Sequence, residues 1–125
     1  MRCRRRPGRR RHEAAFLGGA VAARSAVFLL VTLYVDRPRP TAPHLDTAPP
    51  ISGFPSGHVG AAVALHGALA VLAALRVRGR LRPRLCVLAA LLPALVAFSR
   101  LYRGMHHPTD VLFGLANGGA TLWIM

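Results

Sequence analysis

Residues 99–110 read SRLYRGMHHPTD and place an arginine, two histidines and a carboxylate at the start of an apolar segment. Pro108 is tolerated only in the first turn of a helix, so we expect a helix to begin near residues 107–109, with His106 at its mouth. Asp110 follows His106 by four residues, a spacing at which its carboxylate can reach the imidazole and stabilise its cation. The pair is therefore a candidate for a histidine nucleophile with an orienting acid.

A second stretch, FPSGHV at residues 54–59, has the same arrangement before another apolar segment. Gly57 permits close approach of the backbone, and Ser56 can cap a helix and donate a hydrogen bond to a phosphate oxygen. His58 falls in the first helical turn, where it can protonate a departing alkoxide as a general acid. Each feature alone also has an ordinary structural explanation, as a turn, a cap or an ion pair. Their occurrence on one face of the molecule would indicate phosphate chemistry.

Two arginines complete this candidate site. Arg39 and Arg100 can each bind phosphate oxygens in a bidentate manner and neutralise negative charge in a transition state. The sequence contains no GxGxxG motif, no P-loop and no zinc-ligand spacing. Cys3 and Cys86 form no CxxC pair and indicate no disulfide framework.

The composition indicates a membrane protein. Of 125 residues, 53% are hydrophobic, yet the net charge is +13 and all 17 basic residues are arginines. A span needs about 20 apolar residues, and only helices satisfy the backbone groups of a single chain in lipid at this length. We expect an all-α, multi-pass membrane helical bundle of about four transmembrane helices after a basic cytoplasmic tail at residues 1–12. The membrane domain is residues 13–125, with spans at about 14–35, 57–75, 85–99 and 109–125.

The placement of the arginines predicts the orientation. Residues 1–11 hold seven arginines and residues 76–84 hold five, and short basic loops stay on the cytoplasmic side. Residues 36–58 and 99–109 then both lie on the extracytoplasmic face of the cell membrane. This topology uses none of the motifs, yet it brings both histidines to one side.

Two features fit this topology less well. Arg24 lies midway along the first span, where a charged side chain is unfavourable unless it faces the bundle or water. Residues 1–23 also resemble a signal peptide with an A-x-A site at residues 20–22. Cleavage there would leave residues 27–35 as the remaining apolar run of the first segment, which is too short to span.

The motifs together resemble the signature of the type 2 phosphatidic acid phosphatase superfamily, membrane lipid phosphatases related to vanadium haloperoxidases. That signature is K-x6-RP, PSGH and SR-x5-H-x3-D, and residues 55–58 and 99–110 match its second and third parts in full. Arg39 and Pro40 match the RP of the first part, but Thr32 stands where the family has lysine. Arg37, in the right loop, and Arg24, more than two turns deeper, are the candidates to supply the missing charge.

The resemblance implies an all-α phosphatase/haloperoxidase core that usually has six spans, of which this chain lacks the first two. It implies metal-independent hydrolysis of a lipid phosphate or diphosphate through a phosphohistidine on His106. Asp110 would orient His106, and His58 would protonate the leaving group. The phosphate would be cradled by Arg39, Ser56, Gly57 and Arg100. No metal or other cofactor is implied, and the candidate substrates are phosphatidate, phosphatidylglycerol phosphate and polyprenyl diphosphate.

Two alternatives to a lipid phosphatase remain open. The first is a truncated relative that inserts in the membrane but does not turn over, which the absent lysine and the missing spans favour. A homodimer could replace those spans. The second is a basic nucleic-acid or membrane-surface binder, but the arginines lie at the ends of spans rather than along amphipathic helices. We therefore expect a lipid phosphate and membrane lipids as partners, and no nucleic acid.

Overall fold

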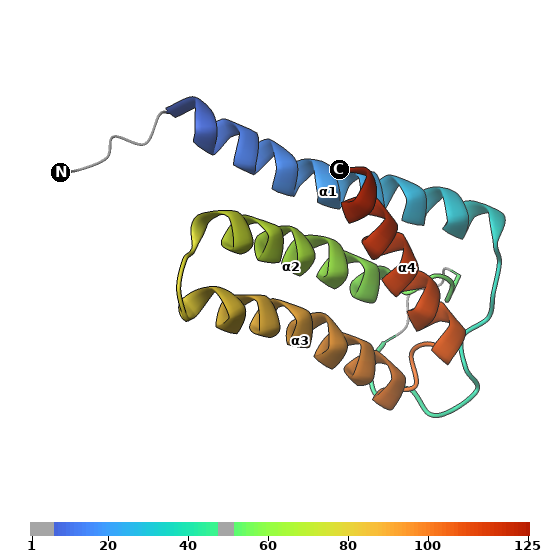
Figure 1. The fold of residues 1–125 in the computed structure, drawn as a ribbon. Coiled ribbons are helices and arrows are strands. Elements are labelled where there is room, and N and C mark those ends of the chain that lie inside the picture. The colour runs from blue at the N-terminus through green and yellow to red at the C-terminus, as the bar shows by residue number, and fades with distance from the viewer. Residues whose placement is uncertain (1–6, 48–51) are drawn as a thin grey trace.

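The computed structural model describes residues 7–47 and 52–125, and each regular element in these ranges is an α-helix. The helices are α1 (Pro7–Tyr34), α2 (Gly57–Arg76), α3 (Leu81–Tyr102) and α4 (Pro108–Ile124) (Figure 1). This confirms the all-helical prediction. The first helix begins at Pro7, within the stretch expected to be a basic tail, while the rest of that tail, residues 1–6, lies outside the described residues together with residues 48–51.

Helix α2 is at the centre of the arrangement. It lies between α1 and α3, and α4 crosses the other helices at an angle (Figure 1). A tight turn joins α2 to the antiparallel α3, and Gly79 in that turn has a φ of +72°, a conformation that other residues adopt at a cost. At the same end of the molecule, Glu13 of α1 forms an ion pair with Arg76 of α2.

The contact between α2 and α4 depends on glycine. A Cβ atom added at Gly114 would lie 2.7 Å from the carbonyl oxygen of Ser56, and one at Gly118 would lie 2.8 Å from that of Gly60. Small residues at helix interfaces let two backbones approach closely, which is the usual packing of helices in membranes. In addition, the Ser56 N–H donates to the carbonyl oxygen of Asp110 at 2.9 Å. The starts of α2 and α4 are therefore held together through their backbones.

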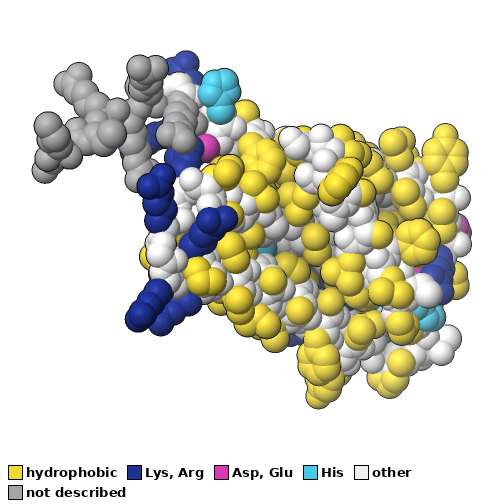
Figure 2. Space-filling view, in the orientation of Figure 1, with side chains coloured by type: hydrophobic (Ala, Val, Ile, Leu, Met, Phe, Trp, Pro, Cys, Tyr) yellow, Lys and Arg dark blue, Asp and Glu magenta, His cyan; other side chains and the backbone are white. Residues whose placement is uncertain are grey.

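Within the described residues, three helical segments are long and apolar enough to cross a membrane: Arg10–Tyr34, Gly57–Arg76 and Leu81–Tyr102. Many of their large apolar side chains are exposed, including Leu33 and Leu95, as expected of surfaces that face lipid. The fourth expected span is shorter, because the 17 residues of α4 extend only about 26 Å at about 1.5 Å per residue. Figure 2 shows one side of the molecule, which is mostly covered by apolar side chains. Arginines gather where α1 starts and where α2 turns into α3.

Gly114→Ala should separate the starts of α2 and α4. Because the new methyl group would overlap the backbone at Ser56, we expect a loss of about 1–3 kcal/mol in the free energy of unfolding, measured in detergent. Gly119→Ala on the same helix is the matched control, since a Cβ there meets nothing within 4 Å. Equal stability of the two variants would contradict the proposed role of the glycine contact.

Candidate active site

The two predicted histidines line one cavity of about 330 Å³. His58 comes from the first turn of α2, and His106 from the turn between α3 and α4. The lining also includes Arg39, Gly57 and Arg100, three of the residues expected to cradle a phosphate. Segments that lie far apart in the sequence thus bring five of the seven predicted site residues to a single cavity. The other two, Ser56 and Asp110, are fully buried and do not line it.

The ring of His106 is held by a backbone group. Its Nδ1 lies 2.8 Å from the carbonyl oxygen of Gly53, and the residue is only 6% exposed. A carbonyl oxygen can only accept, so Nδ1 carries the proton and Nε2 keeps its lone pair for reaction. Sequence reasoning missed Gly53, because the group that acts is a carbonyl oxygen that every residue type has.

Asp110 lies beside His106, but its hydrogen bonds go elsewhere. Its Oδ2 is 3.9 Å from Nδ1 of His106, which is an ion-pair distance beyond hydrogen-bond length. The carboxylate instead accepts the backbone N–H of His107 at 2.7 Å and a bond from Nη1 of Arg37 at 2.9 Å. Asp110 therefore caps α4 and fixes the turn that carries His106. The orienting hydrogen bond expected from the sequence spacing is made by Gly53, and Asp110 acts on the ring through its charge.

The surroundings of His106 favour its neutral form. Burial lowers the pKa of His106 below its ordinary value, and the nearby cations Arg39 and Arg100 lower it further. The hydrogen bond to Gly53 and the charge of Asp110 oppose this shift only in part. At neutral pH the imidazole is thus unprotonated, which is the state that a nucleophile requires.

Two arginines of the cavity, Arg39 and Arg100, each donate a hydrogen bond from one nitrogen and keep another nitrogen unpaired. Nη1 of Arg39 donates to the carbonyl oxygen of Met105 at 2.9 Å, and Nη1 of Arg100 reaches Asp46 at 3.5 Å. The Nε atoms of both arginines are buried and have no hydrogen-bond partner among the described residues. Asp46 also accepts two bonds from Arg103 and was not expected in this role. The positive charges of Arg39 and Arg100 in the lining of the cavity suit an anion.

Residues 13–125 match the family model of the PAP2 superfamily. The chain belongs to the PAP2 superfamily. A comparison with curated proteins gave no match. Among solved structures, the chain resembles a transmembrane PAP2-type phosphatidylglycerolphosphate phosphatase from Bacillus subtilis, with a TM-score of 0.80 and 23% identity. The match covers 86% of this chain and 54% of that one, so this PAP2 chain spans about half of its structural neighbour.

In this PAP2 chain, Ser56 lies buried at the start of α2. It is the N-cap of α2, as predicted, but its side chain makes no capping hydrogen bond. Its Oγ is buried and has no partner among the described residues, and its N–H bonds to Asp110. Ser56 therefore links the two helix starts through its backbone, and its predicted contact with a phosphate stays a prediction.

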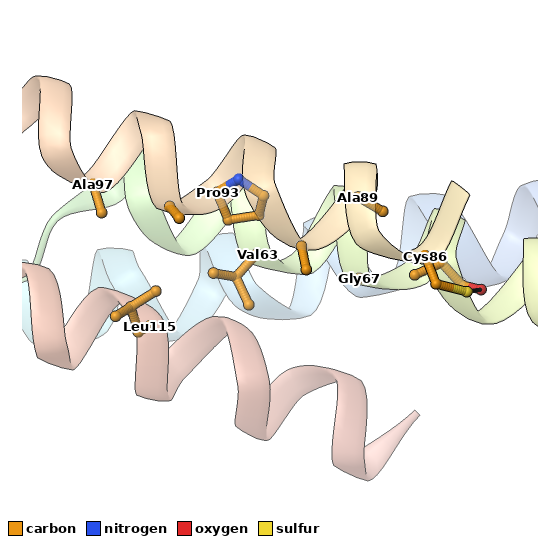
Figure 3. Close-up of a pocket in the computed structure, with 10 residues that line it drawn as sticks. Val63, Gly67, Cys86, Ala89, Pro93, Ala97 and Leu115 are labelled. Atoms are coloured by element: carbon orange, nitrogen blue, oxygen red, sulfur yellow. Dashed lines mark hydrogen bonds between the residues drawn. The ribbon is translucent and has the colours of Figure 1, made fainter. Parts of the chain in front are cut away.

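A larger cavity, of about 480 Å³, lies between α2, α3 and α4 (Figure 3). Small and apolar residues line it, among them Val63 and Gly67 of α2, Pro93 of α3 and Leu115 of α4. Its lining includes no basic side chain that could bind an anion. The residues suited to phosphate chemistry are therefore those of the smaller cavity.

The charge of Arg39 should contribute to the pH dependence of phosphate release by this chain. As the predicted nucleophile, His106 has to be neutral, so kcat/KM should fall as the pH drops through the lowered pKa of His106. Arg39→Gln removes a cation that lowers this pKa, so the fall should move to higher pH. Arg39→Lys keeps the charge and should leave the fall in place. The measurement is the pH profile of kcat/KM for one lipid phosphate, and an identical acid limb in Arg39→Gln and the unmodified protein would contradict the argument.

Proposed function

We propose that the chain hydrolyses a lipid phosphate or diphosphate monoester, without a metal ion, through a phosphohistidine on His106. Its membership of the PAP2 superfamily supports a phosphatase, and three apolar helices support a membrane protein. The observation that carries the proposal is the cavity in which His58 and His106 meet Arg39 and Arg100. Two imidazoles and two guanidinium groups around one space suit an acid–base pair and a tetrahedral anion.

The first step is attack on phosphorus by the lone pair of Nε2 of His106. The bond from phosphorus to the ester oxygen breaks, and His58 as imidazolium gives its proton to the departing alkoxide. Arg39 and Arg100 neutralise charge on the other phosphate oxygens. The positive charge that develops on the His106 ring is stabilised by the hydrogen bond from Nδ1 to Gly53 and by the carboxylate of Asp110.

The second step regenerates the enzyme. His58, now neutral, takes a proton from a water molecule as that water attacks the phosphohistidine. The bond from phosphorus to Nε2 breaks, and inorganic phosphate leaves. His58 is exposed at the cavity, which gives it access to water.

The substrates that fit are phosphatidate, phosphatidylglycerol phosphate and polyprenyl diphosphate, presented at the extracytoplasmic side of the cell membrane. The direction of α2 supports the extracytoplasmic position of the cavity. The first turn of α2 lies at the cavity, and its last residue, Arg76, begins the arginine-rich turn. The 20 residues of α2 extend about 30 Å, the thickness of a bilayer core. A basic turn held in the cytoplasm therefore puts the cavity at the opposite surface.

His106→Ala should lower the rate of phosphate release by more than about a thousandfold, because the nucleophile is lost. The assay is release of inorganic phosphate from a panel of the three substrate types in mixed micelles. His12→Ala is the matched control, since His12 is exposed on α1 near the arginine-rich end. Equal release by His106→Ala and the unmodified protein would reject the mechanism.

A non-catalytic membrane relative is the second candidate, and the neutral Thr32 at the position of the signature lysine favours it. The same panel separates the two candidates. Folded, membrane-inserted protein that releases phosphate from none of the three substrate types would favour the non-catalytic alternative.

A further inference from the structure

Arg24 is a buried cation inside a candidate membrane span. It lies in the apolar segment Arg10–Tyr34 of α1, is only 6% exposed, and lines the same cavity as His58 and His106. A charged side chain at such a position is unfavourable unless it is paired or faces water or the interior of the bundle. Arg24 therefore needs either a partner or a function.

Among the described residues, no hydrogen-bond or ion-pair partner of the Arg24 side chain is found. The Nε and Nη2 atoms of Arg24 are buried and make no hydrogen bond to any described residue. Three of the four acidic residues are occupied by other arginines, because Glu13 pairs with Arg76, Asp46 with Arg103, and Asp110 with Arg37. The side chain of Arg24 thus lines the cavity without a counter-ion from these carboxylates.

The fold makes room for this guanidinium and holds it. A Cβ atom at Gly60 would lie 2.9 Å from Nε of Arg24, and one at Gly57 would lie 3.4 Å from Nη2. Phe28 lies one turn further along α1, and the Cζ atom of Arg24 is 4.9 Å from the centroid of the Phe28 ring, a cation–π contact. Asn117 of α4 reaches the carbonyl oxygen of Arg24 at 3.4 Å. Three helices therefore position the charge at the cavity.

We infer that Arg24 binds the phosphate of the substrate and supplies the positive charge that Thr32 cannot. The inference rests on the proposed function of this cavity and assigns it a further ligand from α1. Thr32 is neutral and does not line the cavity, and Arg37, the other candidate, donates its hydrogen bonds to Thr109 and Asp110. Arg24 is the cation from α1 in the cavity lining, and a guanidinium there can bind the oxygens of a tetrahedral anion.

The test measures anion binding separately from turnover. Orthovanadate, a tetrahedral oxyanion, is titrated against purified protein in detergent, and KM and kcat are measured with the lipid panel. Arg24→Gln should weaken vanadate binding about ten- to a hundredfold, the loss expected for a charged hydrogen-bond donor. Arg24→Lys should lie between Arg24→Gln and the unmodified protein, since it keeps the charge but loses the bidentate geometry. Arg82→Gln, an exposed arginine on α3, is the control and should change nothing.

A structural role for Arg24 predicts a different pattern. If the side chain serves packing, Arg24→Gln and Arg24→Met should both unfold or lose stability without ligand, and this result would overturn the inference. If it serves the anion, Arg24→Met should keep its melting temperature without ligand, because an unpaired buried charge is removed. The rise in melting temperature that vanadate gives the unmodified protein should then disappear.

The remaining outcomes separate this inference from the proposed function. Active protein in which Arg24→Gln binds vanadate as tightly as before would overturn the role of Arg24 and leave the hydrolysis intact. Protein that releases no phosphate, yet binds vanadate through Arg24, would reject the hydrolysis and support the anion site. Unmodified protein that does not bind vanadate would overturn both.

Discussion

The backbone contact between the starts of α2 and α4 is the constraint on which the rest of the structure depends. The Ser56 N–H bonds to the carbonyl of Asp110 at 2.9 Å, and Gly114 lets the two backbones approach closely. His58 follows Ser56 by two residues, and His106 precedes Asp110 by four. Holding the two helix starts together therefore brings both imidazoles to one cavity, although 48 residues separate them in the sequence.

The distribution of charge around this contact follows from the small number of carboxylates. Asp110 pairs with Arg37 and caps α4, while Asp46 holds Arg103 and reaches Arg100. Each carboxylate thereby fixes a loop next to the cavity. The three arginines that line the cavity, Arg24, Arg39 and Arg100, each keep a buried nitrogen without a partner among the described residues. The site therefore has an excess of positive charge, which a phosphate would neutralise.

Much of this arrangement could be predicted from the sequence, because helix starts have strong local signals. PSGH and HPTD both place a turn before an apolar run, and α2 and α4 begin at Gly57 and Pro108. The motifs also identify both histidines, Arg39 and Arg100, which the structure brings to one cavity. The four expected helices are present, and three of them are long and apolar enough to span a membrane, whereas α4 has 17 residues.

The contacts of three features could not be predicted from the sequence. The carbonyl group of Gly53 that accepts the hydrogen bond from His106 belongs to the backbone. The contact between Asp46 and Arg100 depends on how a loop folds over a helix end. Arg24 looked like an anomaly in a span, because its direction depends on how α1 is rotated against α2. The spacing of His106 and Asp110 predicted a hydrogen bond between them, but the carboxylate accepts hydrogen bonds from the N–H of His107 and from Arg37 instead.

The most direct test of the account is the experimental structure of the protein with vanadate bound in detergent or lipid nanodiscs. The account predicts vanadium bonded to Nε2 of His106, with the ring of His58 facing the same anion from the other side. Vanadium bound elsewhere, or the two imidazoles turned to separate spaces, would contradict it.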